Sequence, residues 1–203
     1  MIAVAVVIAV AIAASSCTSP SPEPSAHPSA GSPTGATPAA FRFHVTHHTL
    51  VRGAPKLSHR DHRIAARAIT AARTLITDLY VAGFLDPTAW RSADYREALA
   101  LFGRGARDEA RRELDVLTAG ADAGDRYAEI VARPATLALQ LMTDRAGATI
   151  LISATARFRA VARGEEDATA LRSDGRFVLQ SVDGAWTIVG FDVTRSDRPA
   201  GAS

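Results

Sequence analysis

The chain has 203 residues, of which 47% are hydrophobic and 22% are charged. Its 23 basic and 21 acidic side chains give a formal net charge of +2, and no basic block interrupts this near balance, which argues against a nucleic-acid-binding protein. The single cysteine excludes an intramolecular disulfide, so the fold cannot depend on one. We also find no pattern that calls for a cofactor.

The first 17 residues have the pattern of a secretion signal. Residues 2–14 are entirely apolar. A helix needs about 20 residues to span a bilayer, so this run fits the apolar region of a signal peptide better than a transmembrane helix. Cys17 follows Ala14-Ser15-Ser16, and the whole resembles a bacterial lipoprotein signal with its lipobox. The resemblance implies a lipid on Cys17 and cleavage before it. A non-lipidated signal and an uncleaved anchor are the alternatives.

Residues 18–40 contain six of the ten prolines, together with many serines and alanines. Such a segment buries too little apolar surface to offset the entropy of ordering it, so we expect a disordered tether. Residues 41–198 are then expected to form one domain, followed by a flexible tail over 199–203.

The first half of this domain has mainly helical patterns. Residues 41–51 are rich in β-formers and predict a short strand. Apolar side chains at helical spacing predict a long helix from Ser58 or Asp61 to about Ala82, which Gly83 ends. Three shorter helices are predicted after it: one capped by Asp86, one capped by Ser92, and one over 106–117.

The second half alternates with the period of a strand. Residues 136–141 and 148–162 place apolar side chains on every second position, which predicts strands buried on one face. Asp183-Gly184, between strands 177–182 and 185–193, predicts a two-residue hairpin that pairs Ser181 with Trp186 and Leu179 with Ile188. The expected fold class is therefore α+β, with N-terminal helices packed on a curved antiparallel sheet.

The order of these elements and the terminal hairpin, with Trp186 after Asp183-Gly184, resemble the nuclear transport factor 2-like cone fold over residues 58–195. The layout of anchor, tether, helices and strands is also similar to actinobacterial Mce-associated proteins and uncharacterised secreted lipoproteins. The resemblance implies a conical cavity between sheet and helices. It does not imply one function, because cones of this kind host isomerases, dehydratases and plain binding modules.

The expected cone interior offers few groups for acid–base chemistry. The inward faces of 136–141 and 148–162 are apolar. Asp192 points inward only if its strand is regular through Gly190; glycine in a strand often marks a bulge, so we expect Asp192 to turn outward. Tyr80, Trp186 and Asp192 are the candidates for lining a pocket, and we predict no catalytic residue. The three tyrosines, Tyr80, Tyr95 and Tyr127, are expected to be core or rim aromatics.

Five of the six histidines lie between residues 44 and 62. Imidazoles that share a face of a strand or helix can bind a metal ion. No carboxylate or cysteine completes a recognised ligand spacing, so we expect exposed polar residues and no metal site. The weak metal candidates are His44, His48, His59 and His62.

These observations favour a lipid-anchored extracytoplasmic module at the cell membrane that performs no catalysis. Its partner would be an envelope protein or a small apolar ligand. The first alternative is a small isomerase or dehydratase with its site in the cone, and the second is a metal-handling lipoprotein. A polar, titratable cluster inside the cone would favour the enzyme, whereas an apolar or filled interior would favour the module.

Overall fold

The computed structural model describes residues 41–51, 59–144, 146 and 148–201. The predicted signal, Cys17 and the tether lie outside these ranges. The helices are α1 His59–Tyr80, continued by a π-helical turn Val81–Leu85, α2 Pro87–Ser92, α3 Arg96–Ala100, α4 Arg104–Arg112, α5 Leu114–Leu117 and α6 Ala123–Arg126. The strands are β1 His44–Val51, β2 Glu129–Ala132, β3 Thr136–Thr143, β4 Thr149–Arg163, β5 Ala168–Val182 and β6 Ala185–Pro199.

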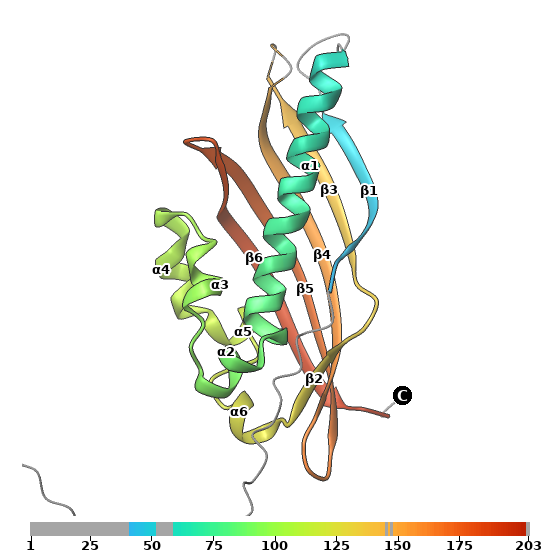
Figure 1. The fold of residues 1–203 in the computed structure, drawn as a ribbon, viewed down its shortest axis with the longest axis vertical. Coiled ribbons are helices and arrows are strands. Elements are labelled where there is room, and N and C mark those ends of the chain that lie inside the picture. The colour runs from blue at the N-terminus through green and yellow to red at the C-terminus, as the bar shows by residue number, and fades with distance from the viewer. Residues whose placement is uncertain (1–40, 52–58, 145, 147, 202–203) are drawn as a thin grey trace, which may run out of the picture. The chain divides into compact units, whose positions relative to one another are not determined.

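The six strands form one sheet in the order β1-β3-β4-β5-β6, with β2 paired to the part of β4 that extends beyond β3. Strands β3 to β6 are antiparallel neighbours, whereas β1 runs parallel to β3. Helix α1 lies along one face of the sheet, and the shorter helices gather beside its C-terminal half (Figure 1). The predicted α+β class, with helices on a curved and unclosed sheet, is confirmed.

The core lies between α1 and the sheet. On β4, every second side chain from Ile152 to Ala162 is at most 2% exposed. Helix α1 faces these residues through small side chains, including Ala68 and Ala72, which allow it to approach the sheet closely. Buried aromatic rings fill the middle of this space, with ring centroids 4.9–6.3 Å apart from Tyr80 to Phe84, Phe158 and Phe177.

One described helical stretch, His62–Leu85, is long and apolar enough to cross a membrane, and an 18-residue window within it has a mean hydropathy of 1.3. Of this window, 61% is buried inside the protein. The helix therefore has the burial of a core helix, whose apolar face is already covered by the sheet.

The hairpin between β5 and β6 has the predicted register. Ser181 pairs with Trp186 and Leu179 with Ile188, and the turn residues Asp183 and Gly184 have φ angles of 51° and 82°. Positive φ at both positions is what a type I′ turn requires. Trp186 is only partly buried, because it lies two residues after Gly184, close to the tip of the hairpin.

The sequence pattern underestimated the lengths of two strands. β5 begins at Ala168 and not near Phe177, and β6 ends at Pro199 and not near Val193. The pattern also missed α6 and β2. The helix predicted over 106–117 is divided into α4 and α5 at Glu113, and α3 begins after Tyr95 rather than Ser92. Finally, Ile150 is 45% exposed, because the register between β3 and β4 shifts next to Thr143 and the inward alternation begins only at Ile152.

Gly83 does not end the helix, because the π-helical turn continues to Leu85. Its role is close packing: a Cβ on Gly83 would lie 2.8 Å from the carbonyl oxygen of Leu117. The backbone N–H of Ala119 donates to the Gly83 carbonyl at 2.8 Å. The glycine thus brings the segment after α5 against the end of α1.

Candidate functional site

The inner face of the β5–β6 pair changes character along its length. Phe177 pairs with Phe191 near the hairpin, but further along Ser173 pairs with Arg195 and Leu171 with Asp197. These polar residues lie on the face that packs against the helices, since Val193 and Phe177 on the same alternation are buried. With Tyr80 and Tyr127 they form what we call the inner polar cluster: Tyr80, Tyr127, Ser173, Arg195 and Asp197.

Arg195 and Asp197 form a bidentate ion pair. Arg195 Nε donates to Asp197 Oδ1 at 2.9 Å, and Arg195 Nη2 donates to Asp197 Oδ2 at 2.5 Å. The side chains are 8% and 24% exposed, respectively. Burial makes the pairing necessary, because an unpaired guanidinium in this position would lose most of its hydration. The arginine is therefore fixed, while one side of the carboxylate remains within reach of solvent.

The third nitrogen of Arg195 bonds to the backbone at the end of α5. Arg195 Nη1 donates to the carbonyl oxygens of Asp115 and Thr118, at 2.9 and 2.5 Å. These carbonyls lie at the C-terminal end of α5, where backbone oxygens have no helical partners. The guanidinium carbon also lies 5.9 Å from the centroid of the Phe84 ring. Arg195 thus fixes both Asp197 and the end of α5.

Tyr80 closes the cluster toward the aromatic core. Its hydroxyl and the Ser173 hydroxyl are 3.0 Å apart and hydrogen-bonded, and the two residues are 2% and 1% exposed. Burial raises the pKa of Tyr80 far above its usual value, so the group is neutral. A neutral tyrosine–serine pair this deep can donate a hydrogen bond but is poorly placed to meet a ligand.

Tyr127 follows α6, is 5% exposed, and its buried hydroxyl has no hydrogen-bond partner among the described residues. Burial raises its pKa, the positive charge of Arg126 lowers it, and the negative charge of Asp197 raises it. The side chain of Thr169 also lowers this pKa, although it lies outside hydrogen-bonding geometry. Asp197 is therefore close enough to act on the hydroxyl electrostatically. A buried hydroxyl without a partner costs about 1–3 kcal/mol, which makes Tyr127 the member of the cluster that most needs an explanation.

The structure does not bring the three candidate pocket residues together. Tyr80 lies in the core, and Trp186 lies near the tip of the hairpin. Asp192 is exposed on the opposite face of the sheet, where it pairs with Arg176. The reason is a bulge: Val178 pairs with Gly190 but Leu179 with Ile188, so Val189 is an extra residue and the alternation reverses after it.

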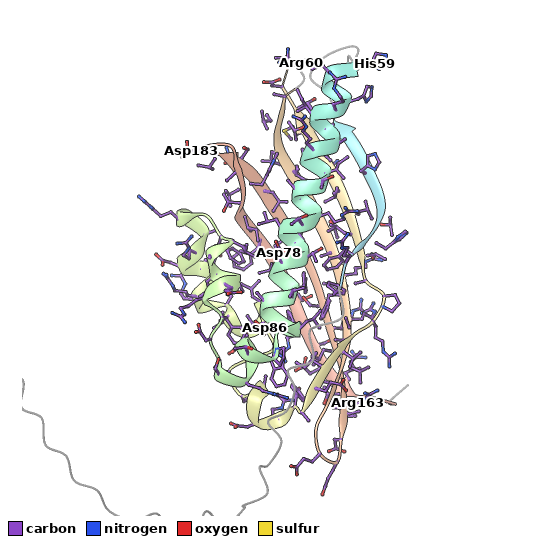
Figure 2. The ribbon with its side chains drawn as sticks, viewed as in Figure 1. His59, Arg60, Asp78, Asp86, Arg163 and Asp183 are labelled. Carbon is purple, nitrogen blue, oxygen red and sulfur yellow. The ribbon has the colours of Figure 1, made fainter. Side chains whose placement is uncertain are left out.

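The four histidine candidates are exposed, His44 and His48 on β1 and His59 and His62 on α1. Figure 2 shows His59 at the N-terminal end of α1, with Asp86 beyond the other end of the helix. In the part of the chain that the structure describes, no three His, Cys, Asp or Glu side chains are grouped so that they could hold a metal ion.

The sequence pattern did not identify Arg195, Asp197 and Tyr127 as site residues. For the first two, a signal was present: the alternation Phe191, Val193, Arg195, Asp197 continues past the point where the predicted strand ended. Two charged residues at inward positions look like the end of a buried strand. For Tyr127, which lies in a loop, no periodic pattern was available.

No family model and no curated protein matches the chain. Among solved structures, it is similar to a hexachlorocyclohexane dehydrochlorinase, LinA type 2, at 14% identity and a TM-score of 0.46, covering 72% of this chain and 95% of that one. A second one, LinA type 3 from Novosphingobium barchaimii LL02, is 13% identical with a TM-score of 0.46, and the match covers 72% of this chain and 97% of that one. A putative scytalone dehydratase from Novosphingobium aromaticivorans DSM 12444 is 12% identical with a TM-score of 0.42, and the match covers 70% of this chain and 93% of that one.

These similar structures are named as enzymes, which contradicts the prediction of a module without catalysis. At such identities the likeness concerns the fold alone, and the substrates named belong to those proteins. The error has a structural reason in this chain. The prediction rested on the apolar inner faces of β3 and β4, whereas the polar inner residues lie on the parts of β5 and β6 near Ser173 and Arg195.

Proposed function

We propose that the protein is a small acid–base enzyme of the isomerase or dehydratase type, with the inner polar cluster as its active site. The observation that carries the proposal is the Tyr127 hydroxyl, which is buried without a hydrogen-bond partner among the described residues and whose pKa is raised by the negative charge of Asp197 after the larger effect of burial. Buried polar groups are normally paired, and unpaired ones gather where a ligand completes the bonding. A substrate oxygen would be the missing partner.

The roles follow from the chemistry of the side chains. Asp197, as a carboxylate, would accept a proton from the carbon next to a substrate carbonyl. Tyr127 would donate a hydrogen bond to the carbonyl oxygen as negative charge develops there. In an isomerisation the proton returns to another carbon; in a dehydration it leaves with the β-hydroxyl as water. Arg195 would act as a positioning residue, since all three of its nitrogens are already bonded to protein atoms.

The packing of the core indicates that a substrate would reach the inner polar cluster at its Asp197 end. The middle of the core is filled by Tyr80, Phe84, Phe158 and Phe177, so a substrate would approach from the side of Asp197, whose side chain is 24% exposed. Elsewhere on the inner face, β4 offers only apolar side chains from Ile152 to Ala162. The proposal therefore concerns small substrates that bind at the edge of the core.

Substituted phenols test the oxyanion contact without knowledge of the substrate, because a phenolate resembles an enolate in charge and geometry. Binding of fluorinated phenols to the wild type would be measured by ¹⁹F NMR. Tyr127→Phe should weaken it at least about tenfold, the worth of one hydrogen bond to a charged group. Tyr95→Phe is the matched control, because Tyr95 is as buried and its hydroxyl already donates to the Gly120 carbonyl at 2.7 Å.

Turnover would be tested by exchange of substrate C–H for deuterium in D₂O, over a panel of enolisable ketones and β-hydroxy carbonyl compounds. Asp197→Asn should lower the exchange about 10²–10⁴-fold, as expected for loss of a positioned base. A folded wild type that binds no phenol would contradict the proposal. So would phenol binding that Tyr127→Phe leaves unchanged.

The location of the enzyme is a separate part of the proposal. We propose that the chain is exported, cleaved and lipidated at Cys17, and that the proline-rich residues 18–40 tether the domain to the outer side of the cell membrane. The support comes from the sequence pattern alone: an apolar run, small residues, one cysteine and a polar, proline-rich stretch.

A further inference from the structure

The outer face of the sheet, opposite the helices, carries a surface hollow of about 330 Å³. Its polar lining comes from three strands: Thr155 and Arg157 on β4, Arg172, Asp174 and Arg176 on β5, and Asp192 and Thr194 on β6. All of these positions alternate with buried residues such as Ala156 and Phe177, so they face away from the inner polar cluster. Pockets that hold small ligands begin at about 300 Å³, so the hollow is large enough for a small molecule.

The strand register arranges these side chains in two rows. Thr155, Arg176 and Asp192 are paired across β4, β5 and β6, and Arg157, Asp174 and Thr194 form the next row. Arg157 and Arg176 are thus diagonal neighbours, with Thr155 opposite Arg176 and two residues from Arg157. Diagonal neighbours on one face lie about 7–8 Å apart, which long side chains bridge.

Only some of the charged side chains in the hollow form ion pairs with described residues. Arg172 Nε donates to Asp174 Oδ2 at 2.5 Å. The other oxygen, Asp174 Oδ1, is buried and has no hydrogen-bond partner among the described residues. Within the same described part of the chain, neither Arg157 nor Arg176 has a carboxylate within ion-pair distance. Judged on the described residues, the hollow therefore contains two guanidinium groups outside any ion pair, and one carboxylate oxygen that lacks a donor.

We propose that this hollow binds a small hydroxylated or aminated anion. The carboxylate or phosphate of the ligand lies between Arg157 and Arg176, where two guanidinium groups and the Thr155 hydroxyl provide donors. A hydroxyl or amino group on the adjacent carbon donates to the Asp174 carboxylate, whose side chain is 30% exposed. Asp192 lies beyond Arg176 in its row and disfavours a second negative charge at that end, so the site selects ligands with one anionic group.

Four probes separate the two halves of this recognition: glycerate carries the anion and the hydroxyl, propionate the anion alone, glycerol the hydroxyls alone, and glycerol 3-phosphate replaces the carboxylate. Binding to the folded domain would be measured by calorimetry and by NMR. Glycerate or glycerol 3-phosphate should bind with a dissociation constant of about 1 mM or tighter. Propionate and glycerol should each bind at least about tenfold more weakly, since each lacks one set of bonds.

Variants locate the site. Arg157→Gln and Arg176→Gln should each weaken binding of the hydroxylated anion about tenfold or more. Asp174→Ala should remove the preference for glycerate over propionate, because it removes the acceptor for the ligand hydroxyl. Arg159→Gln is the matched control: it removes the same charge from the same strand, and Arg159 does not line the hollow. Tyr127→Phe should bind these probes like the wild type, which separates this site from the proposed active site.

Two results would overturn the proposal. One is a folded wild type that binds neither glycerate nor glycerol 3-phosphate at a ligand concentration of about 10 mM, tenfold above the expected dissociation constant. The other is binding that falls equally in Arg157→Gln and Arg159→Gln, which would mean general attraction to a positive surface. If only one of the two hydroxylated anions binds, the proposal stands and that probe identifies the anionic group.

Discussion

At Gly83 the chain leaves no room for a side chain. A Cβ there would lie 2.8 Å from a backbone oxygen, Leu117 O, and backbone atoms cannot move aside as a flexible side chain can. The contact matters because Ala119 bonds to Gly83 and Thr118 bonds to Arg195. One glycine thus controls how the segment after α5 meets both the end of α1 and the inner polar cluster.

Gly83→Ala should therefore lower the free energy of unfolding by about 1–3 kcal/mol. The measurement is chemical denaturation, followed by circular dichroism. Gly105→Ala is the control: Gly105 lies within helix α4, and among the described residues no atom beyond its chain neighbours and the backbone of its own helix lies within 4 Å of the position that its Cβ would take. Alanine there should be neutral or stabilise by about 0.4–1 kcal/mol. Equal effects of the two substitutions would show that the close contact at Gly83 is not important.

Among the elements, those with a local signal were predicted best. The Asp183-Gly184 turn fixed the hairpin register because positive φ at two adjacent positions permits few other connections. The cap at Asp86 was equally local, and its side chain accepts a hydrogen bond from Thr88 N at 2.8 Å. The parallel pairing of β1 with β3 joins segments about 90 residues apart, and no local pattern in residues 41–51 indicated it.

The candidate site was missed for a related reason. Its residues come from the end of α1, from a loop and from the far ends of β5 and β6, and only the folded chain brings them together. The alternation past Val193 predicts that Arg195 faces inward, but it does not predict the backbone oxygens of Asp115 and Thr118 that receive this charge. Without those acceptors, burying an arginine would be energetically unfavourable, so the sequence alone favoured a strand that ends before Arg195.

The N-terminal segment is an element whose role is tested by a single change. If Cys17 carries the lipid, Cys17→Ala should release the protein from the membrane or block its processing, because a proline-rich tether has no other means of holding the domain. Detergent-phase partitioning of wild type and variant would show the difference. Both proteins in the aqueous phase, or both in the detergent phase with unchanged mass, would contradict lipidation.

Over the whole molecule, the sheet separates two environments. Its inner face holds the aromatic core and the inner polar cluster, and its outer face holds the charged hollow over β4 to β6. Strand alternation makes this separation possible, because neighbouring residues such as Ser173 and Asp174 point to opposite faces. The two proposed sites can therefore be tested independently with single substitutions.

The chain's three tyrosines link the stability of this fold to alkaline pH. Tyr80, Tyr95 and Tyr127 are 2%, 3% and 5% exposed, and burial raises the pKa of each. In the unfolded chain they titrate near pH 10. Because the folded state holds these protons more tightly, their contribution to stability is complete below about pH 10 and is lost as pH rises through the folded pKa values.

We therefore expect less tyrosinate absorbance at 295 nm from the folded protein at pH 10 than from the unfolded chain, and a cooperative rise at higher pH that coincides with loss of near-ultraviolet circular dichroism. Tyr127→Phe removes one of the linked groups, and with it a buried hydroxyl that has no hydrogen-bond partner in the described part of the chain, so the alkaline midpoint should move to higher pH. A gradual rise in absorbance near pH 10 with the native circular dichroism retained would place at least one tyrosine in water and contradict the buried arrangement.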